Sequence, residues 1–209
     1  MGARTYLNTY LTVGDPQAMQ QALDRFQRVL QRIGYRDPLL SELSRSHDWE
    51  ELERGDFGLL LPQQAVVSFD RALWVQPLVM SVSSAWYPKL GAPLLEFNLD
   101  FDEASVYDWQ TEQYRRGWEG ALWRLTSIVA EAFEESGACL SCDGCESDQW
   151  RCLLAGDAAA RLWSFDLAVV LPSLAAAYSP LPSSHCKAIV AGRIALARKS
   201  AWGVKPWEA

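Results

Sequence analysis

The stretch LLEFNLDF, residues 94–101, decides how the rest of this chain of 209 residues is interpreted. Apolar and polar side chains alternate along it, a period of two that is typical of a β-strand with one face in the core and one in water. The apolar positions are Leu95, Phe97, Leu99 and Phe101. The polar positions, extended by one residue, are Glu96, Asn98, Asp100 and Asp102. The sequence therefore predicts a half-buried strand with an acidic outer face.

A long amphipathic helix is expected after this strand, from Ser105 to Gly137, followed by a return strand over Ala138–Cys142. Ser105 with Asp108 approximates a capping box, and Gly137 is a natural helix end. The apolar side chains recur every three or four residues, at Tyr114, Trp118, Ala121, Leu122, Leu125, Ile128, Val129, Ala132 and Phe133. A continuous stripe of this kind has to cover a sheet.

The N-terminal part repeats the order of strand, acidic cap and helix. Thr5 to Val13 is expected to be a strand, and Asp15 with Pro16 then caps a helix that stops at Gly34. Two short helical segments are expected between residues 37 and 55, the second capped by Ser46. Strands are expected at 57–61, 64–69 and 73–83, where Pro77 indicates an edge or a bulge because proline cannot donate to a ladder.

The C-terminal third is expected to hold a short helix capped by Ser147, a strand over 163–171 and a last strand over 187–199. A helix is the rival interpretation of the last segment. Together the elements predict a two-layer α+β domain over residues 1–209, with two main amphipathic helices on one face of a mostly antiparallel sheet. A degenerate β-α-β-β duplication, with pseudo-halves 1–92 and 93–209, is compatible with this order.

Composition excludes several classes of function. The net charge of −7 and a pI near 4.9 argue against nucleic-acid binding, which needs a basic footprint. The chain has no apolar run of bilayer length and no signal-peptide core, so the expected location is cytoplasmic and no membrane partner is expected. Five cysteines, an odd number, indicate reduced thiols more than a disulfide framework.

The cysteines at 139, 142, 145 and 152 are spaced closely enough to suggest a metal site. A structural zinc site usually pairs two separate knuckles, whereas these residues form one overlapping run, and Cys139 and Cys142 would point to opposite faces of a strand. We therefore expect no metal and no cofactor. Common nucleotide, zinc-protease and serine-hydrolase motifs are also missing from the chain.

The function expected from these features is that of a non-catalytic, acidic, tryptophan-rich module that binds a protein with a basic surface. A bacterial immunity or inhibitor protein fits this description. The expected contact residues are Trp86, Tyr87, Glu96, Asp100 and Asp102, because loop aromatics beside acidic groups resemble the anchors and rim of a protein interface. The alternative is a metal-assisted hydrolase or transferase that uses the carboxylates near Asp100.

Overall fold

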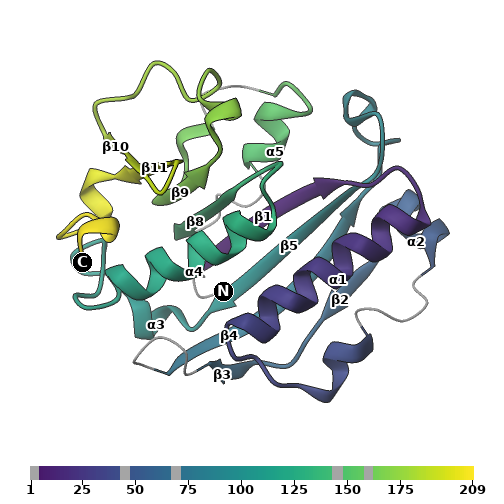
Figure 1. Cartoon of the computed structure of the whole chain (residues 1–209), viewed down its shortest axis with the longest axis horizontal. Coiled ribbons are helices and arrows are strands. Elements are labelled where there is room, and N and C mark those ends of the chain that lie inside the picture. Colours follow the sequence, from purple (N-terminus) through teal and green to yellow (C-terminus); the bar gives the residue numbers. More distant parts are fainter. Residues whose placement is uncertain (1–4, 43–47, 67–71, 143–147, 158–161) are drawn as a thin grey trace.

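A computed structural model describes residues 5–42, 48–66, 72–142, 148–157 and 162–209. One large sheet, in which every strand pair is antiparallel, follows the order β10-β11-β9-β8-β1-β5-β4-β2, and β3 also pairs with β4. The helices α1 and α4 lie across one face of it (Figure 1). The predicted α+β class, with two main helices on one face of the sheet, is confirmed.

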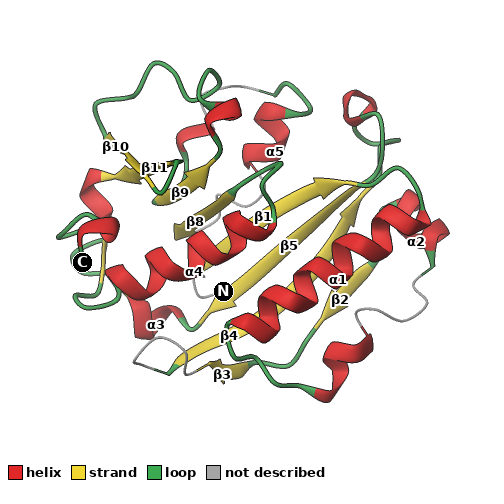
Figure 2. Cartoon of the chain, in the orientation of Figure 1, coloured by secondary structure: helices red, strands yellow, loops and turns green. Residues whose placement is uncertain are grey.

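The described strands are β1 (Thr5–Thr12), β2 (Gly58–Leu60), β3 (Gln64–Val66), β4 (Leu73–Val82), β5 (Leu94–Phe101), β6 (Tyr107–Asp108), β7 (Gln113–Tyr114), β8 (Ala138–Cys142), β9 (Leu167–Val170), β10 (His185–Val190) and β11 (Arg193–Arg198). The described α-helices are α1 (Pro16–Arg32), α2 (Trp49–Arg54), α3 (Glu103–Val106), α4 (Glu119–Ala132) and α5 (Asp148–Leu153). Figure 2 separates these elements from the loops. No helix in the described part of the chain is both long and apolar enough to cross a membrane.

The two strands at the centre of the sheet are β1 and β5. They pair over their whole lengths, from Thr5 opposite Phe101 to Thr12 opposite Leu94. β8 lies on the other side of β1, and β4 lies on the other side of β5. Because side chains alternate between faces, the odd-numbered positions of β5 face the helices and the even-numbered positions form the opposite face, here called the back face.

The helix α1 forms as its sequence predicts. The side chain of Asp15 accepts a hydrogen bond from the Ala18 amide at 2.7 Å, and Pro16 opens the first turn. Its apolar stripe is buried against the sheet at Met19, Ala22, Leu23, Phe26, Val29 and Leu30. The ring of Phe97 on β5 lies 4.9 Å from that of Phe26 on α1 and 4.9 Å from that of Phe133, which follows α4. Phe97 therefore contacts both parts of the helical layer, α1 and the residue that follows α4.

The second helix is shorter than expected, because the predicted position of its first residue is wrong. α4 begins at Glu119 rather than at Ser105, after the short α3 and the hairpin β6–β7. The Asp108 carboxylate accepts a backbone hydrogen bond two residues on, and Glu112 (φ 54°) and Gly117 (φ 88°) have left-handed backbone. These local turns stop a helix from running through, although the apolar spacing continues across them.

Pro77 occupies the point where the neighbouring strand is interrupted. β4 is not an edge strand, because β5 pairs with it on one side and β2 and β3 pair with it in succession on the other. The carbonyl of Pro77 accepts from Leu61, which lies between β2 and β3. The side of Pro77 that lacks an N–H donor therefore faces the gap between β2 and β3.

The C-terminal segment departs from the expected single strand. Residues 185–198 form the hairpin β10–β11, which turns at Ala191 (φ 50°) and Gly192 (φ 79°). Two consecutive residues with positive φ are characteristic of the type I′ turn that joins strands most tightly. The strand expected over 163–171 is limited to β9. The N-cap of α2 is Asp48, whose side chain accepts from the Glu50 amide at 2.8 Å, and not the expected Ser46. Ser46 and Ser147 themselves lie outside the described residues.

Candidate partner-binding surface

The acidic face of β5 is buried, which corrects the expectation that it lies in water. Glu96 is 3% exposed and Asp100 is 5% exposed, and all eight residues of β5 are buried. The strand is central in the sheet, and its back face is also covered. At one end of that face, Leu94 packs in a cluster with Trp150 of α5. Glu96 and Asp100 therefore do not present a solvent-facing carboxylate row, and their role in partner binding stays a prediction.

Asp102 and Trp86, in contrast, are exposed. Asp102 follows the end of β5, where its backbone amide donates to the Trp74 carbonyl at 3.4 Å and its carboxylate accepts from Ser105 at 2.6 Å. The side chain of Trp74 is itself 47% exposed. The structure thus places an exposed carboxylate next to an exposed tryptophan, at the opposite end of β4 from the loop that holds Trp86.

Trp86 is the most exposed aromatic side chain among the described residues, at 61%. Its ring nonetheless packs closely on Gly55, the residue with left-handed backbone that ends α2. The same loop is tied to α2 by Ser83, whose hydroxyl donates to the Glu53 carbonyl at 2.5 Å. One face of the indole is therefore supported by the protein while much of the ring stays open to water.

Gly55 belongs to an acidic segment, although the sequence gives no sign that this segment is connected with Trp86. Residues 48–56, DWEELERGD, contain five carboxylates and one arginine. Glu50, Glu51, Glu53 and Asp56 are exposed, and Arg54 lies within 3.8 Å of Glu50 and 3.2 Å of Asp56. The charge run is visible in the sequence, but only the fold brings it to a tryptophan 31 positions away.

A partly apolar strip runs along the back face of β4 toward the Trp86 loop. Leu60 of β2 lies opposite Leu78 and is 58% exposed. The strip, as defined here, comprises Leu60, Trp74, Leu78, Met80 and Val82, all exposed or half-buried. From Trp74 to Val82 the strand spans about 27 Å at its usual rise per residue. Exposed apolar surface of this extent beside charged groups is typical of interaction sites.

Tyr87, the other aromatic residue expected to contact a partner, packs against α5, and its contact with a partner stays a prediction. Its ring packs edge-on against Trp150 at 5.2 Å, and the guanidinium of Arg151 lies 5.9 Å from its centroid. Arg151 in turn pairs with Asp157 at 2.9 Å. Tyr87 therefore anchors the loop to α5, and its half-buried ring leaves Trp86 as the more prominent aromatic group.

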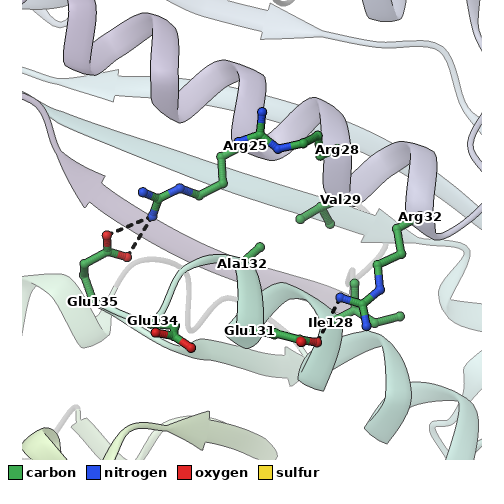
Figure 3. A pocket seen from close by; sticks show the side chains of 9 residues that line it. All are labelled: Arg25, Arg28, Val29, Arg32, Ile128, Glu131, Ala132, Glu134 and Glu135. Atoms are coloured by element: carbon green, nitrogen blue, oxygen red, sulfur yellow. Dashed lines mark hydrogen bonds and ion pairs between the residues drawn. The ribbon is translucent and has the colours of Figure 1, made fainter.

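A groove of about 450 Å³ lies between α1 and α4 (Figure 3). Arginines of α1 face glutamates at the end of α4: Arg25 binds Glu135 through contacts of 2.9 and 2.8 Å, and Arg32 binds Glu131 at 2.9 Å. The floor includes Val29 and Ala132. The opposite charges across this groove connect the two helices through partly exposed ion pairs.

A second charged cluster, centred on Asp166, connects β11 of the C-terminal hairpin with β8 and β7. The buried carboxylate of Asp166 accepts from the Cys142 amide at 2.9 Å and from the Tyr114 hydroxyl at 3.1 Å, and it lies 3.3 Å from Arg198. The Trp202 ring stacks on Tyr114 at 4.2 Å. Burial raises the pKa of Asp166 and outweighs the opposing influence of Arg198. The pKa of Tyr114 is raised well above its usual value, first by burial and then by Asp166.

Three of the four clustered cysteines can be placed. Cys139 is buried, and burial raises the pKa of its thiol to about 12, whereas Cys142 and Cys152 are half-buried. Cys145 lies outside the described residues. Within the described ranges, no three His, Cys, Asp or Glu side chains are grouped so that they could hold a metal ion.

Comparisons with known proteins return no relative: no protein family, no curated protein and no solved structure matches this chain. The class that the structure establishes is that of its fold, a mixed α+β protein with one large antiparallel sheet.

Proposed function

We propose that this chain is a non-catalytic, cytoplasmic protein-binding module whose partner presents a basic surface. The observation that carries the proposal is the packing of Trp86: a 61% exposed indole supported on Gly55, the C-cap of the acidic helix α2. Tryptophan is enriched among the residues that dominate binding energy, and a ring fixed in place loses little conformational entropy on binding.

Charge supports the nature of the partner. Glu51 and Glu53 are exposed residues of α2, whose C-cap Gly55 supports the proposed anchor, and the whole chain carries −7. Complementary charge accelerates encounter and excludes wrong partners. A small acidic protein that neutralises a basic toxin or enzyme is the biological role that fits this surface best, so we propose a bacterial immunity or inhibitor protein as the particular form.

The test is affinity capture from the native host, performed in parallel with the wild-type chain, with Trp86→Ala and with a control variant. Leu181→Ala removes another exposed apolar side chain (42% exposed), from the loop before β10. A basic protein retained by the wild type and by Leu181→Ala, but lost from Trp86→Ala, is the expected result. Equal retention by all three proteins would exclude the Trp86 surface, and recovery of an acidic protein or a nucleic acid would contradict the proposed partner chemistry.

A further inference from the structure

The edge strand β10 carries the most exposed large apolar side chain in the described structure. Ile189 is 77% exposed, next to Ile194 of β11, which is buried. Among the described strands, β10 pairs with β11 and ends the sheet. It extends over six residues without a proline and carries one charged side chain, Lys187. Long edges with little protection are templates for pairing with another strand.

The hairpin geometry defines which backbone groups face outward. Val190 and Arg193 flank the two-residue turn, and the pair that closes such a turn exchanges both backbone hydrogen bonds. Alternation then directs the N–H and C=O groups of Lys187 and Ile189 away from β11. The His185 amide also points outward, but it donates to the Pro182 carbonyl at 3.0 Å.

We propose that β10 pairs antiparallel with β10 of a second copy of this chain, about a two-fold axis at Ala188. In this register Lys187 lies opposite Ile189 of the second copy, and each of these residues satisfies the outward backbone groups of the other. The apolar stem of the lysine covers the exposed isoleucine. A slip that set Lys187 opposite itself would place like charges together, and a slip centred on Ile189 would bring Lys187 opposite the turn.

The opposite edge of the sheet lacks these properties. β2 and β3 are three residues each, and they are separated by a segment containing Pro62. A short, proline-interrupted edge is a common protection against unwanted pairing. The contrast indicates that only one of the two edges is suited to extend the sheet into a second copy.

The first test is sedimentation velocity over concentrations from low micromolar to near millimolar. We expect the wild type to move from monomer to dimer, since pairing of a single strand buries less than a standard interface. Ile189→Lys should raise the dimer dissociation constant at least about tenfold, whereas the matched change Leu60→Lys at the other edge should leave it unchanged. A wild type that stays monomeric throughout, or dimers that persist in Ile189→Lys, would overturn the proposal.

The second test examines the register. Ala188→Cys, made in a Cys186→Ser background, places the new thiols on the two-fold axis, where Cα atoms of a non-hydrogen-bonded pair are about 4.5 Å apart and a disulfide can form. Mild oxidation is expected to produce a covalent dimer from this variant and none from Cys186→Ser alone. If crosslinking fails while a dimer still sediments, the Ala188-centred register is wrong. Because neither test involves the Trp86 surface, a failure here leaves the proposed function intact.

Discussion

The indole of Trp86 lies against Gly55, so closely that a Cβ atom at Gly55 would come within 2.9 Å of the ring. Gly55 also has φ 81°, which side chains rarely adopt. Gly55→Ala is therefore expected to lower the free energy of unfolding by about 1–2 kcal/mol and to displace Trp86. Urea denaturation measures the first effect, and a shift of the Trp86 indole signal in an ¹H–¹⁵N spectrum measures the second.

Gly58→Ala is the matched control, three residues further along the chain. No atom lies within 4 Å of the position that its Cβ would take, and its φ is not in the left-handed range. The free energy of unfolding of Gly58→Ala should differ from that of the wild type by less than about 0.5 kcal/mol, and the Trp86 indole signal should not move. Equal effects of the two substitutions would contradict the contact between Gly55 and Trp86.

Leu125 lies at the centre of the buried face of α4 and is 0% exposed. Leu125→Asp is expected to prevent folding because it places a charge in the core without a partner. Leu125→Ala should leave a folded protein that is less stable by about 2–5 kcal/mol. Arg124→Gln, on the exposed side of the same helix, serves as the control. Circular dichroism and thermal melting distinguish these outcomes, and a soluble Leu125→Asp protein with unchanged melting would refute the packing of α4.

The sequence predicts the elements of this fold that depend on local signals better than those that depend on contacts between distant residues. α1 is correct almost to the residue because Asp15, Pro16 and the apolar stripe are local signals. The start of α4 was misplaced because the three- and four-residue spacing continues through β7, and Tyr114 is buried for a tertiary reason, its stacking on Trp202. Periodicity reports that a side chain is buried but not which element holds it.

The surface was harder to predict than the fold. Alternation correctly separates the two faces of β5, but polar residues on one face do not reveal that the strand is central and covered on both sides. The exposure of Trp86 agrees with its place in a turn-rich loop. The glycine that supports its ring is the C-cap of α2, and no spacing rule connects residues 48–56 with residue 86 before the chain has folded.

Asp166 predicts a pH dependence whose sign is opposite to that of an ordinary salt-bridged carboxylate. Its pKa in the folded protein is raised from 3.8, so the folded state binds the proton more tightly than the unfolded state does. The stability due to this group is therefore fully present below the unfolded pKa and is lost as pH rises through the folded pKa. Measured by urea denaturation from acid to neutral pH, the wild type should lose stability relative to Asp166→Asn.

Arg198→Gln provides a second arm of this test. Arg198 lowers the pKa of Asp166, so its removal should raise that pKa further and extend the loss of stability to higher pH. If the wild type instead gains stability over Asp166→Asn as pH rises, the ion pair outweighs burial and the assigned direction is wrong.

The two ion pairs across the α1–α4 groove are expected to differ in strength. Arg25 makes two contacts with Glu135 and lies 5.4 Å from the centre of the Phe133 ring, whereas Arg32 makes one contact with Glu131. Double-mutant cycles in urea should assign each pair less than about 1 kcal/mol, with the larger coupling at Arg25 and Glu135. High salt should weaken both. A larger coupling at Arg32 and Glu131 would contradict this ranking.

The proposed binding surface separates into an anchor and a steering region, which kinetic measurements can distinguish once the partner has been recovered. Trp86→Ala removes a supported, exposed aromatic group and should raise the dissociation rate, with a loss on the order of 2 kcal/mol or more. Reversing charge at Glu51 and Glu53 to lysine should instead slow association and reduce its dependence on salt, because charges near the edge of a contact mainly guide encounter. Reversal at Glu131 and Glu135, at the end of α4, changes the net charge equally. Surface plasmon resonance at two salt concentrations provides both rates, and if the two double reversals slow association equally, net charge alone attracts the partner and the acidic segment of α2 has no special role.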